Sequence, residues 1–174
     1  MDNAPNKLKP VLVSAAIMIV LFSTPVLSLV NLFCCAGIMF GGFAGVISYT
    51  KQVQQLKLSF PPKDAILIGL VSGIISAIVS TAIDLTISLS TAYNPMALVL
   101  ESLSQLGREI PPQSLEMFEK ISNEYIKFGY SPTYTIAMLV TLLILFPLFG
   151  MLGSFIAYQI YKKKNLQQPN LPNL

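Results

Sequence analysis

Apolar residues fill four long stretches of the chain, and most polar residues lie between these stretches. A transmembrane helix needs about 20 predominantly apolar residues to cross the roughly 30 Å hydrocarbon layer of a bilayer. The four stretches are close to this length or longer, and each is therefore predicted to be a membrane-spanning helix. The predicted spans cover residues 11–30, 32–49, 65–90 and 134–161.

The first two predicted spans have almost no polar connector between them. Asn31 alone interrupts the apolar run, so the turn must be tight and can lie anywhere from Pro25 to Phe33. Proline lacks a backbone donor and clashes with the preceding helical turn, so Ser23-Thr24-Pro25 predicts a break or kink in the first helix. These residues favour a helical hairpin.

The N-terminal segment also has features of a secretory signal peptide. Lys7 and Lys9 precede an apolar core, and the small residue Ser28 lies where a signal peptidase could cleave. The apolar run continues past Ser28, which favours the uncleaved hairpin, with cleavage as the alternative. A lipoprotein signal ending at Cys34 is less favoured, because the bulky Phe33 occupies the position where a small residue is needed.

A longer and more polar segment, residues 91–133, separates the last two predicted spans. Prolines divide it, and apolar residues recur at helical spacing in both parts, which predicts two amphipathic helices with one apolar stripe each. Each stripe must rest on the top of the bundle, the bilayer surface or another protein, and a cap folded onto the bundle is the simplest of these. The stripes are Met96, Val99, Leu100, Leu103 and Leu106, then Leu115, Phe118, Ile121, Tyr125 and Phe128.

Composition also indicates an integral membrane protein. Of the 174 residues 53% are hydrophobic and only 11% are charged, whereas soluble domains have about 25% charged residues. The absence of histidine excludes Ser-His-Asp and Cys-His nucleophilic machinery, His-ligated haem and nearly all zinc sites with nitrogen ligands. The sequence contains no phosphate-binding glycine loop, nucleophile motif or cofactor fingerprint. We therefore expect a non-enzymatic protein without cofactor or metal.

Lysines are concentrated on one set of predicted helix flanks. Basic residues outnumber acidic ones in residues 1–10, in the connector 50–64 and in the tail 162–174, whereas acidic residues predominate in residues 91–133. Cytoplasmic flanks are enriched in Lys and Arg, so both termini and the connector are predicted to be cytoplasmic, with the long loop outside. The tail is predicted to be disordered. Tyrosines, which favour membrane interfaces, lie at predicted inner ends (Tyr49, Tyr158, Tyr161) and outer ends (Tyr93, Tyr130, Tyr134).

Small residues recur every four positions within the second and third predicted spans. This spacing places them on one helix face, where the missing side chains let another helix approach closely. The simplest prediction is that these two spans pack against each other within one monomer, and self-association through one of the faces is the alternative. The rows are Gly37, Gly41 and Gly45 in one span and Gly69, Gly73 and Ala77 in the other.

Asp84 is the only ionisable residue inside a predicted span. Intramembrane carboxylates are costly and usually face a cavity, a partner or a transport pathway. About twenty residues, or about 30 Å of helix, separate Asp84 from Asp64, which places it near the outer boundary, within reach of water. A solvated structural role is the simpler hypothesis, and an ion or proton pathway is the alternative. The candidates for such a pathway are Asp84, Ser76, Ser80 and Ser88.

Cys34 and Cys35 adjoin a sequence pattern that resembles a known group of proteins. We expect both cysteines to behave as small apolar residues, with acylation as the alternative, since no third soft ligand is available for a metal. The pattern Asn31…Cys34-Cys35…Gly41-Gly42 resembles the second helix of small bacterial four-span proteins classed as domains of unknown function. The resemblance covers roughly residues 10–90. It implies the same fold in a bacterial inner membrane, and it carries no activity or ligand residues that could be transferred to this chain.

The sequence thus predicts an all-α, four-helix membrane bundle with two amphipathic helices in its outer loop. We expect a non-catalytic module that binds no nucleic acid and assembles in the lipid bilayer, as a homo-oligomer or within a larger membrane complex. Its contact surfaces would be the small-residue faces and the outer helices. A small permease or ion path centred on Asp84 is the competing hypothesis, and an envelope sensor with a ligand-binding outer loop is a third.

Overall fold

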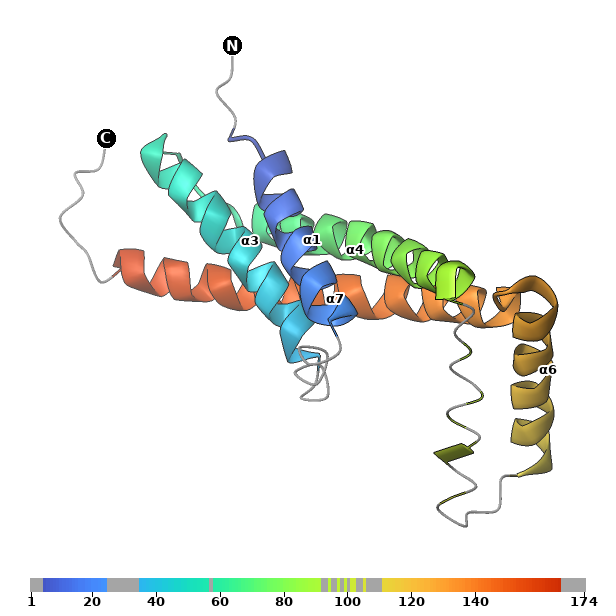
Figure 1. The fold of residues 1–174 in the computed structure, drawn as a ribbon. Coiled ribbons are helices and arrows are strands. Elements are labelled where there is room, and N and C mark those ends of the chain that lie inside the picture. The colour runs from blue at the N-terminus through green and yellow to red at the C-terminus, as the bar shows by residue number, and fades with distance from the viewer. Residues whose placement is uncertain are drawn as a thin grey trace. The chain divides into compact units, whose positions relative to one another are not determined.

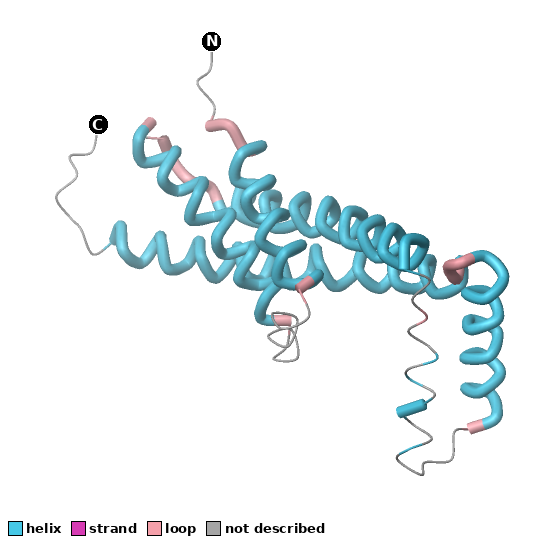
Figure 2. The backbone as a smooth tube through the Cα atoms, in the orientation of Figure 1, coloured by secondary structure: helices cyan, strands magenta, loops and turns pink. Residues whose placement is uncertain are grey.

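The computed structural model describes residues 5–24, 35–56, 58–91, 94, 97, 99, 101, 102, 105 and 111–166. All regular elements in these ranges are α-helices, which confirms the predicted all-α class (Figures 1 and 2). The predicted turn of the first hairpin, most of the first amphipathic helix and the tail beyond residue 166 lie outside the described residues. The helices are α1 (Leu8–Ser23), α3 (Ala36–Gln55), α4 (Pro62–Thr91), α6 (Pro112–Phe128) and α7 (Pro132–Leu166).

The helices of the first hairpin differ in their bounds from the predicted spans: α1 is shorter, with 16 residues, and α3, with 20 residues, begins and ends later. α1 ends at Ser23, and Thr24 has an extended backbone (φ −88°, ψ 119°), as is typical of a residue before proline. α3 begins at Ala36 because Cys35 adopts a left-handed conformation with φ 56°. Cys35 is therefore the N-cap of α3, where the sequence predicted a residue inside a helix.

Two described helices, α4 and α7, are long and apolar enough to cross a membrane. They contain 30 and 35 residues and extend beyond the predicted spans at both ends. α1 contains only 16 residues, and the last residues of α3 are mostly polar, from Lys51 to Gln55. By length and composition, two of the four predicted spans can therefore cross a bilayer unaided.

The chain divides into two compact units, to which α4 and α7 both contribute. Unit 1 comprises Met1–Ser80 and Leu142–Leu174, and it contains α1, α3, the beginning of α4 and the end of α7. Unit 2 comprises Thr81–Thr141, and it contains the end of α4, all of α6 and the beginning of α7.

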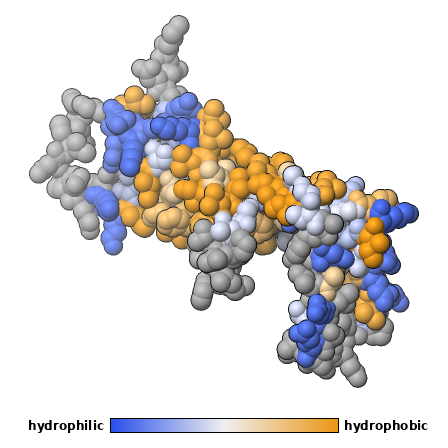
Figure 3. Space-filling model, in the orientation of Figure 1, coloured by the Kyte–Doolittle hydropathy of each residue, from blue (hydrophilic) through white to orange (hydrophobic). Residues whose placement is uncertain are grey.

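Unit 1 has large apolar side chains on its outside. Figure 3 shows hydrophobic residues over most of its visible surface and hydrophilic residues gathered at one end. A soluble monomer rarely exposes a contiguous apolar patch larger than a few hundred Å². The exposed side chains belong to several helices and include Leu12, Val20, Phe40, Ile144 and Leu148.

An aromatic cluster lies at one end of unit 1. The ring of Phe60, which follows α3 in the chain, lies 5.1 Å from the Tyr49 ring, 5.2 Å from Tyr158 and 5.4 Å from Tyr161, measured between centroids. Tyr49 belongs to α3, and the other two tyrosines belong to α7. The cluster therefore fixes the last turns of α3 and the end of α7 to the short loop before α4.

In unit 2, α6 is an amphipathic helix, as predicted for the second stripe of the outer loop. It buries Ile121 and Tyr125. It ends at Gly129, whose left-handed conformation (φ 77°) is easily adopted by glycine and whose amide donates to the Tyr125 carbonyl at 2.9 Å. Asn94 Nδ2 donates to Ser122 Oγ at 3.1 Å. These contacts hold α6 within unit 2.

Candidate functional site

The backbones of α3, α4 and α7 meet in unit 1 at a cluster of small residues. A Cβ atom added to Gly69 would lie 2.5 Å from the carbonyl oxygen of Gly150, and one added to Gly73 would lie 2.5 Å from the backbone nitrogen of Pro147. A Cβ at Gly42 would overlap the same Gly150 carbonyl. Because the obstructing atoms are backbone atoms, these positions have no room for a side chain.

Small residues of α7 also belong to this cluster, which we call the small-residue crossing. Ser154 is buried, and its Oγ donates a hydrogen bond to the Gly42 carbonyl at 3.0 Å. A Cβ added to Gly153 would overlap the backbone of Met39 in α3. Close packing and weak polar contacts are the main forces between helices in lipid, where the hydrophobic effect is absent. This crossing is built from such contacts.

The glycine row of α3 packs against α1. A Cβ added to Gly45 would lie 2.6 Å from Ser14 Cβ and 3.1 Å from the Pro10 carbonyl oxygen, and one added to Gly41 would overlap the Met18 side chain. Gly37, the third member of the predicted row, is also buried.

The partners of the two glycine rows differ from those expected. The sequence predicted that the two spans would pack against each other, and the structure shows that the α3 row faces α1, whereas the α4 row of Gly69 and Gly73 faces α7. The reason is that α3 has glycines on two faces. Gly42 lies about 100° around the helix from Gly41, so α3 contacts α1 on one face and α7 on the other. Ala77 of the α4 row is fully buried.

Ser76 of the predicted pathway and the nearby Ser72 bond α4 to α1. Ser14 Oγ donates to Ser72 Oγ at 2.9 Å, and Ser72 Oγ donates to the Ile68 carbonyl at 2.7 Å. Ser76 Oγ donates to the Ser72 carbonyl at 2.7 Å and lies 3.3 Å from the Ala15 carbonyl. These hydroxyls bond to one another and to backbone carbonyls, so Ser72 and Ser76 stabilise the packing of α4 against α1.

The other pathway candidates lie farther along α4. Ser80 is 2% exposed, and its hydroxyl has no hydrogen-bond partner among the described residues. Asp84, one turn later, is half-buried, and Ser88 is buried. A buried hydroxyl without a partner is unusual in proteins. Of the predicted pathway residues, Ser80 is therefore the one whose buried hydroxyl has no hydrogen-bond partner among the described residues.

A partly buried carboxylate at the start of α4 was not singled out by the sequence. Asp64 Oδ1 lies 2.7 Å from Lys7 Nζ, and its Oδ2 accepts a hydrogen bond of 2.6 Å from the hydroxyl of the fully buried Tyr49. The first turn of a helix favours a negative charge. Asp64 thereby links the beginnings of α1 and α4 to α3. The available signal was that Asp64 is the only acid in a lysine-rich connector.

In unit 2, Glu124 of α6 caps the beginning of α7. Its carboxylate accepts hydrogen bonds from Ser131 Oγ at 2.5 Å, Thr133 Oγ1 at 2.7 Å and the Thr133 amide at 3.1 Å. Ser131 Oγ in turn accepts a bond from the Tyr134 amide at 3.1 Å, as an N-cap serine does. The bond from Ser131, followed by those from Thr133, lowers the pKa of the Glu124 carboxyl below its usual value.

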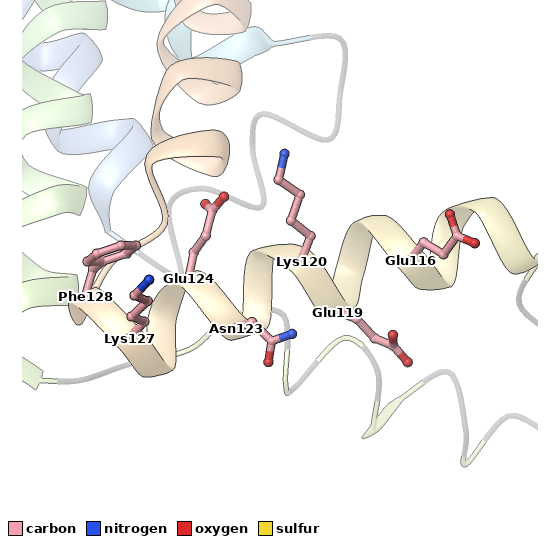
Figure 4. Close-up of a pocket in the computed structure, with 7 residues that line it drawn as sticks. All are labelled: Glu116, Glu119, Lys120, Asn123, Glu124, Lys127 and Phe128. Carbon is pink, nitrogen blue, oxygen red and sulfur yellow. The ribbon is translucent and has the colours of Figure 1, made fainter.

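An open depression of about 510 Å³ lies along the polar side of α6 (Figure 4). The acidic and basic side chains around it point to different sides of the helix, so they do not converge on a common point. Among the described residues, no group of three or more side chains is suited to hold a metal ion. The depression is lined by Glu116, Glu119, Lys120, Asn123, Glu124, Lys127 and Phe128.

Among the described residues, none of these sites has the geometry of an active site. Comparison with known proteins assigns no role either. No family model, curated protein or solved structure matches the chain. The resemblance to small bacterial four-span proteins, based on the pattern from Asn31 to Gly42, therefore stays a prediction. The interpretation of function depends on the packing and polar contacts of the two units.

Proposed function

We propose that this chain is a four-span protein of the bacterial inner membrane that acts as a non-catalytic assembly module, with unit 1 as its membrane domain. The observation that carries the proposal is the distribution of side chains in unit 1. Serines and glycines occupy the helix contacts of its interior beside buried apolar residues, and many other large apolar side chains, such as Phe40 and Ile144, are exposed. This arrangement suits a lipid solvent, in which helices associate through small residues.

The contacts of α1 support its assignment as a span although it is short. Lys7 pairs with Asp64, and Ser14 pairs with Ser72, so the partners are 57 and 58 residues apart in the chain. α1 therefore runs parallel to α4 from its first turn onward. If α4 crosses the bilayer, α1 enters from the same side. Because lysines favour cytoplasmic flanks, this side is assigned to the cytoplasm.

The surface available for assembly is α6. The glycine faces of α3 and α4 already contact α1 and α7 within the monomer, which leaves them covered. α6 exposes Met117, Ile126 and Phe128, with exposed fractions of 56%, 80% and 52%. Apolar side chains of this size are common anchors of protein interfaces. The assembly hypothesis therefore favours the outer helix over the small-residue faces.

Purification from native membranes in mild detergent, followed by light scattering, tests this proposal. The wild type is expected to purify as an oligomer or with a stoichiometric companion protein, and the Met117→Ser/Ile126→Ser variant is expected to purify as a monomer. Leu148→Ala changes an exposed apolar residue of unit 1 and serves as the control that keeps the assembly. A wild type that is monomeric and free of companions would contradict the assembly role.

A small permease is the second candidate, and the unpartnered hydroxyl of Ser80 favours it. Ser80 lies one turn from Asp84, the one carboxylate within the predicted spans. Flux of protons or monovalent cations into reconstituted vesicles would be abolished by Asp84→Asn and reduced by Ser80→Ala. Thr86→Val is the control, because the Thr86 hydroxyl is exposed and bonds only within its own helix. Equal flux in vesicles with wild type, with Asp84→Asn and without protein would exclude transport.

A further inference from the structure

Contacts within unit 1 gather six exposed lysines at one end, which we call the basic end. The Lys7–Asp64 pair joins α1 to α4, Tyr49 joins α3 to the same carboxylate, and Phe60 packs on Tyr161 of α7. Every one of the six lysines lies within three residues of one of these contacts. The exposed lysines of the basic end are Lys9, Lys51, Lys63, Lys162, Lys163 and Lys164.

Acidic neighbours among the described residues do not neutralise the positive charge of the basic end. Among the described residues of unit 1, Asp64 is the one carboxylate, and it is occupied by Lys7 and Tyr49. None of the six lysines forms an ion pair with a described residue. Figure 3 shows the resulting hydrophilic region where α1 begins and where α3 and α7 end. An external anion can therefore bind these lysines without displacing an ion pair with a described residue.

Exposed apolar side chains lie directly beside these lysines. Leu8 precedes Lys9 and is 61% exposed, and Ile160 lies two residues before Lys162 and is 45% exposed. Leu56 at the end of α3 is 46% exposed. A surface that pairs ammonium groups with adjacent apolar side chains is complementary to a phospholipid, whose phosphate lies next to its acyl chains. A soluble anion would leave the apolar side chains uncovered.

We propose that the basic end is a binding surface for anionic phospholipids of the cytoplasmic leaflet. The inference rests on the proposed membrane location of unit 1. Lysine ammonium groups act as point charges without the fixed fork of arginine, so the surface selects lipids by negative charge and accepts different headgroup shapes. Bound lipid would bridge the beginnings of α1 and α4 to the ends of α3 and α7, and so stabilise unit 1.

Thermal unfolding of the full-length protein in detergent, with phosphatidylglycerol or phosphatidylcholine added, tests this inference. Phosphatidylglycerol is expected to raise the unfolding midpoint by several degrees more than phosphatidylcholine, because a ligand that binds the folded state stabilises it. The triple variant Lys51→Gln/Lys63→Gln/Lys162→Gln is expected to lose this difference. The matched variant Lys51→Arg/Lys63→Arg/Lys162→Arg keeps the charges and is expected to retain it.

Two controls make the result specific to the basic end. Lys120→Gln/Lys127→Gln removes two lysines of α6 and is expected to behave as wild type. High salt is expected to weaken the phosphatidylglycerol effect, since it screens exposed charges. Equal midpoints with both lipids in the wild type, or a full phosphatidylglycerol effect in the triple Gln variant, would overturn the inference. If the triple variant fails to fold, Lys162→Gln alone must show a reduced effect.

Alkaline extraction of membranes separates this inference from the proposed function. Protein that leaves the membrane pellet at high pH without detergent is not integral, and the proposed function then fails together with the lipid surface. Protein that stays in the pellet and shows no preference for phosphatidylglycerol leaves the membrane proposal intact and overturns the lipid surface alone.

Discussion

The small-residue crossing of unit 1 and the corner between α6 and α7 in unit 2 hold helices together by opposite means. In the crossing, Gly42, Gly69 and Gly150 bring backbone against backbone, and the absence of side chains is what permits the contact. In the corner, the Glu124 side chain reaches from one helix to cap the next through Ser131. The crossing therefore has no room for an added side-chain atom. The corner should tolerate any substitution that keeps the Glu124 carboxylate oxygens as hydrogen-bond acceptors.

The largest expected effect follows from adding one methyl group to the crossing. Gly153→Ala would place a Cβ against the Met39 backbone, which cannot move without shifting α3. We expect a loss of about 3 kcal/mol or more in the free energy of unfolding. Thermal or denaturant unfolding in detergent, followed by circular dichroism, measures it.

Gly41→Ala is the matched control for this change. Its added Cβ overlaps a side-chain atom, Met18 Cγ, and lies 3.2 Å from the Met18 amide nitrogen and the Ser14 carbonyl oxygen. Met18 must change rotamer and the α1 backbone must shift by a few tenths of an ångström, so the expected loss is smaller, about 2 kcal/mol. Equal losses for Gly153→Ala and Gly41→Ala would contradict the distinction between backbone and side-chain contacts at these two positions.

The polar contact at the basic end is expected to have an intermediate effect. Tyr49→Phe removes a hydrogen bond to a carboxylate and leaves one oxygen of Asp64 without its donor, which should cost about 1.5 to 2 kcal/mol of unfolding free energy. Tyr158→Phe is the control, since its ring contacts Phe60 in the same cluster and no hydrogen bond of its hydroxyl is recorded among the described residues. An equally large loss in Tyr158→Phe would show that the loss of a hydroxyl from this cluster, and not of the bond to Asp64, causes the effect.

The corner of unit 2 is expected to respond locally. Glu124→Ala removes both acceptor oxygens, and with them the bonds from the Ser131 hydroxyl and from the hydroxyl and amide of Thr133. Amide hydrogen exchange at Thr133 should accelerate several-fold, while protection in unit 1 stays unchanged. Glu119→Ala, on the exposed side of the same helix, should have no effect. Loss of protection in both units would contradict the local role.

The smallest effect is the pH dependence of this corner. The folded-state pKa of Glu124 is lowered, so its carboxylate stabilises the corner above the unfolded pKa of about 4.3. This contribution decreases as the pH falls through the folded value. Exchange protection at Thr133, corrected for intrinsic rates, should be constant from neutral pH to pH 5 and fall only in stronger acid. A loss between pH 7 and pH 5 would contradict the assignment.

The sequence was sufficient to predict elements whose signal is local. The apolar stretches predict the helical class, the stripe from Leu115 to Phe128 predicts α6, and the residue before Pro25 predicts the end of α1. Each of these signals depends on neighbours within a few turns of one helix. The left-handed Cys35 was not predictable, because non-glycine residues rarely adopt this conformation and the sequence around it reads as continuous helix.

The pairing of the helices and the contacts of the Asp64 carboxylate could be known only from the structure. Gly41 and Gly42 are adjacent in the sequence, yet they face α1 and α7. A small-residue row identifies a face for close approach but contains no information about which helix will approach. Asp64 appeared as one acid among solvated lysines, because its partners Lys7 and Tyr49 are distant along the chain and meet only in the folded unit.

The central claim is that α1 and α3 cross the bilayer together with α4 and α7. Cysteine labelling in intact cells with a membrane-impermeant maleimide tests it most directly, in a background with Cys34→Ser and Cys35→Ser. Four spans predict that Ser28→Cys in the first hairpin and Ser114→Cys in α6 are labelled from outside, whereas Leu58→Cys is labelled only after permeabilisation. Labelling of Ser28→Cys only after permeabilisation, or in neither condition, would show that the hairpin does not reach the outer surface.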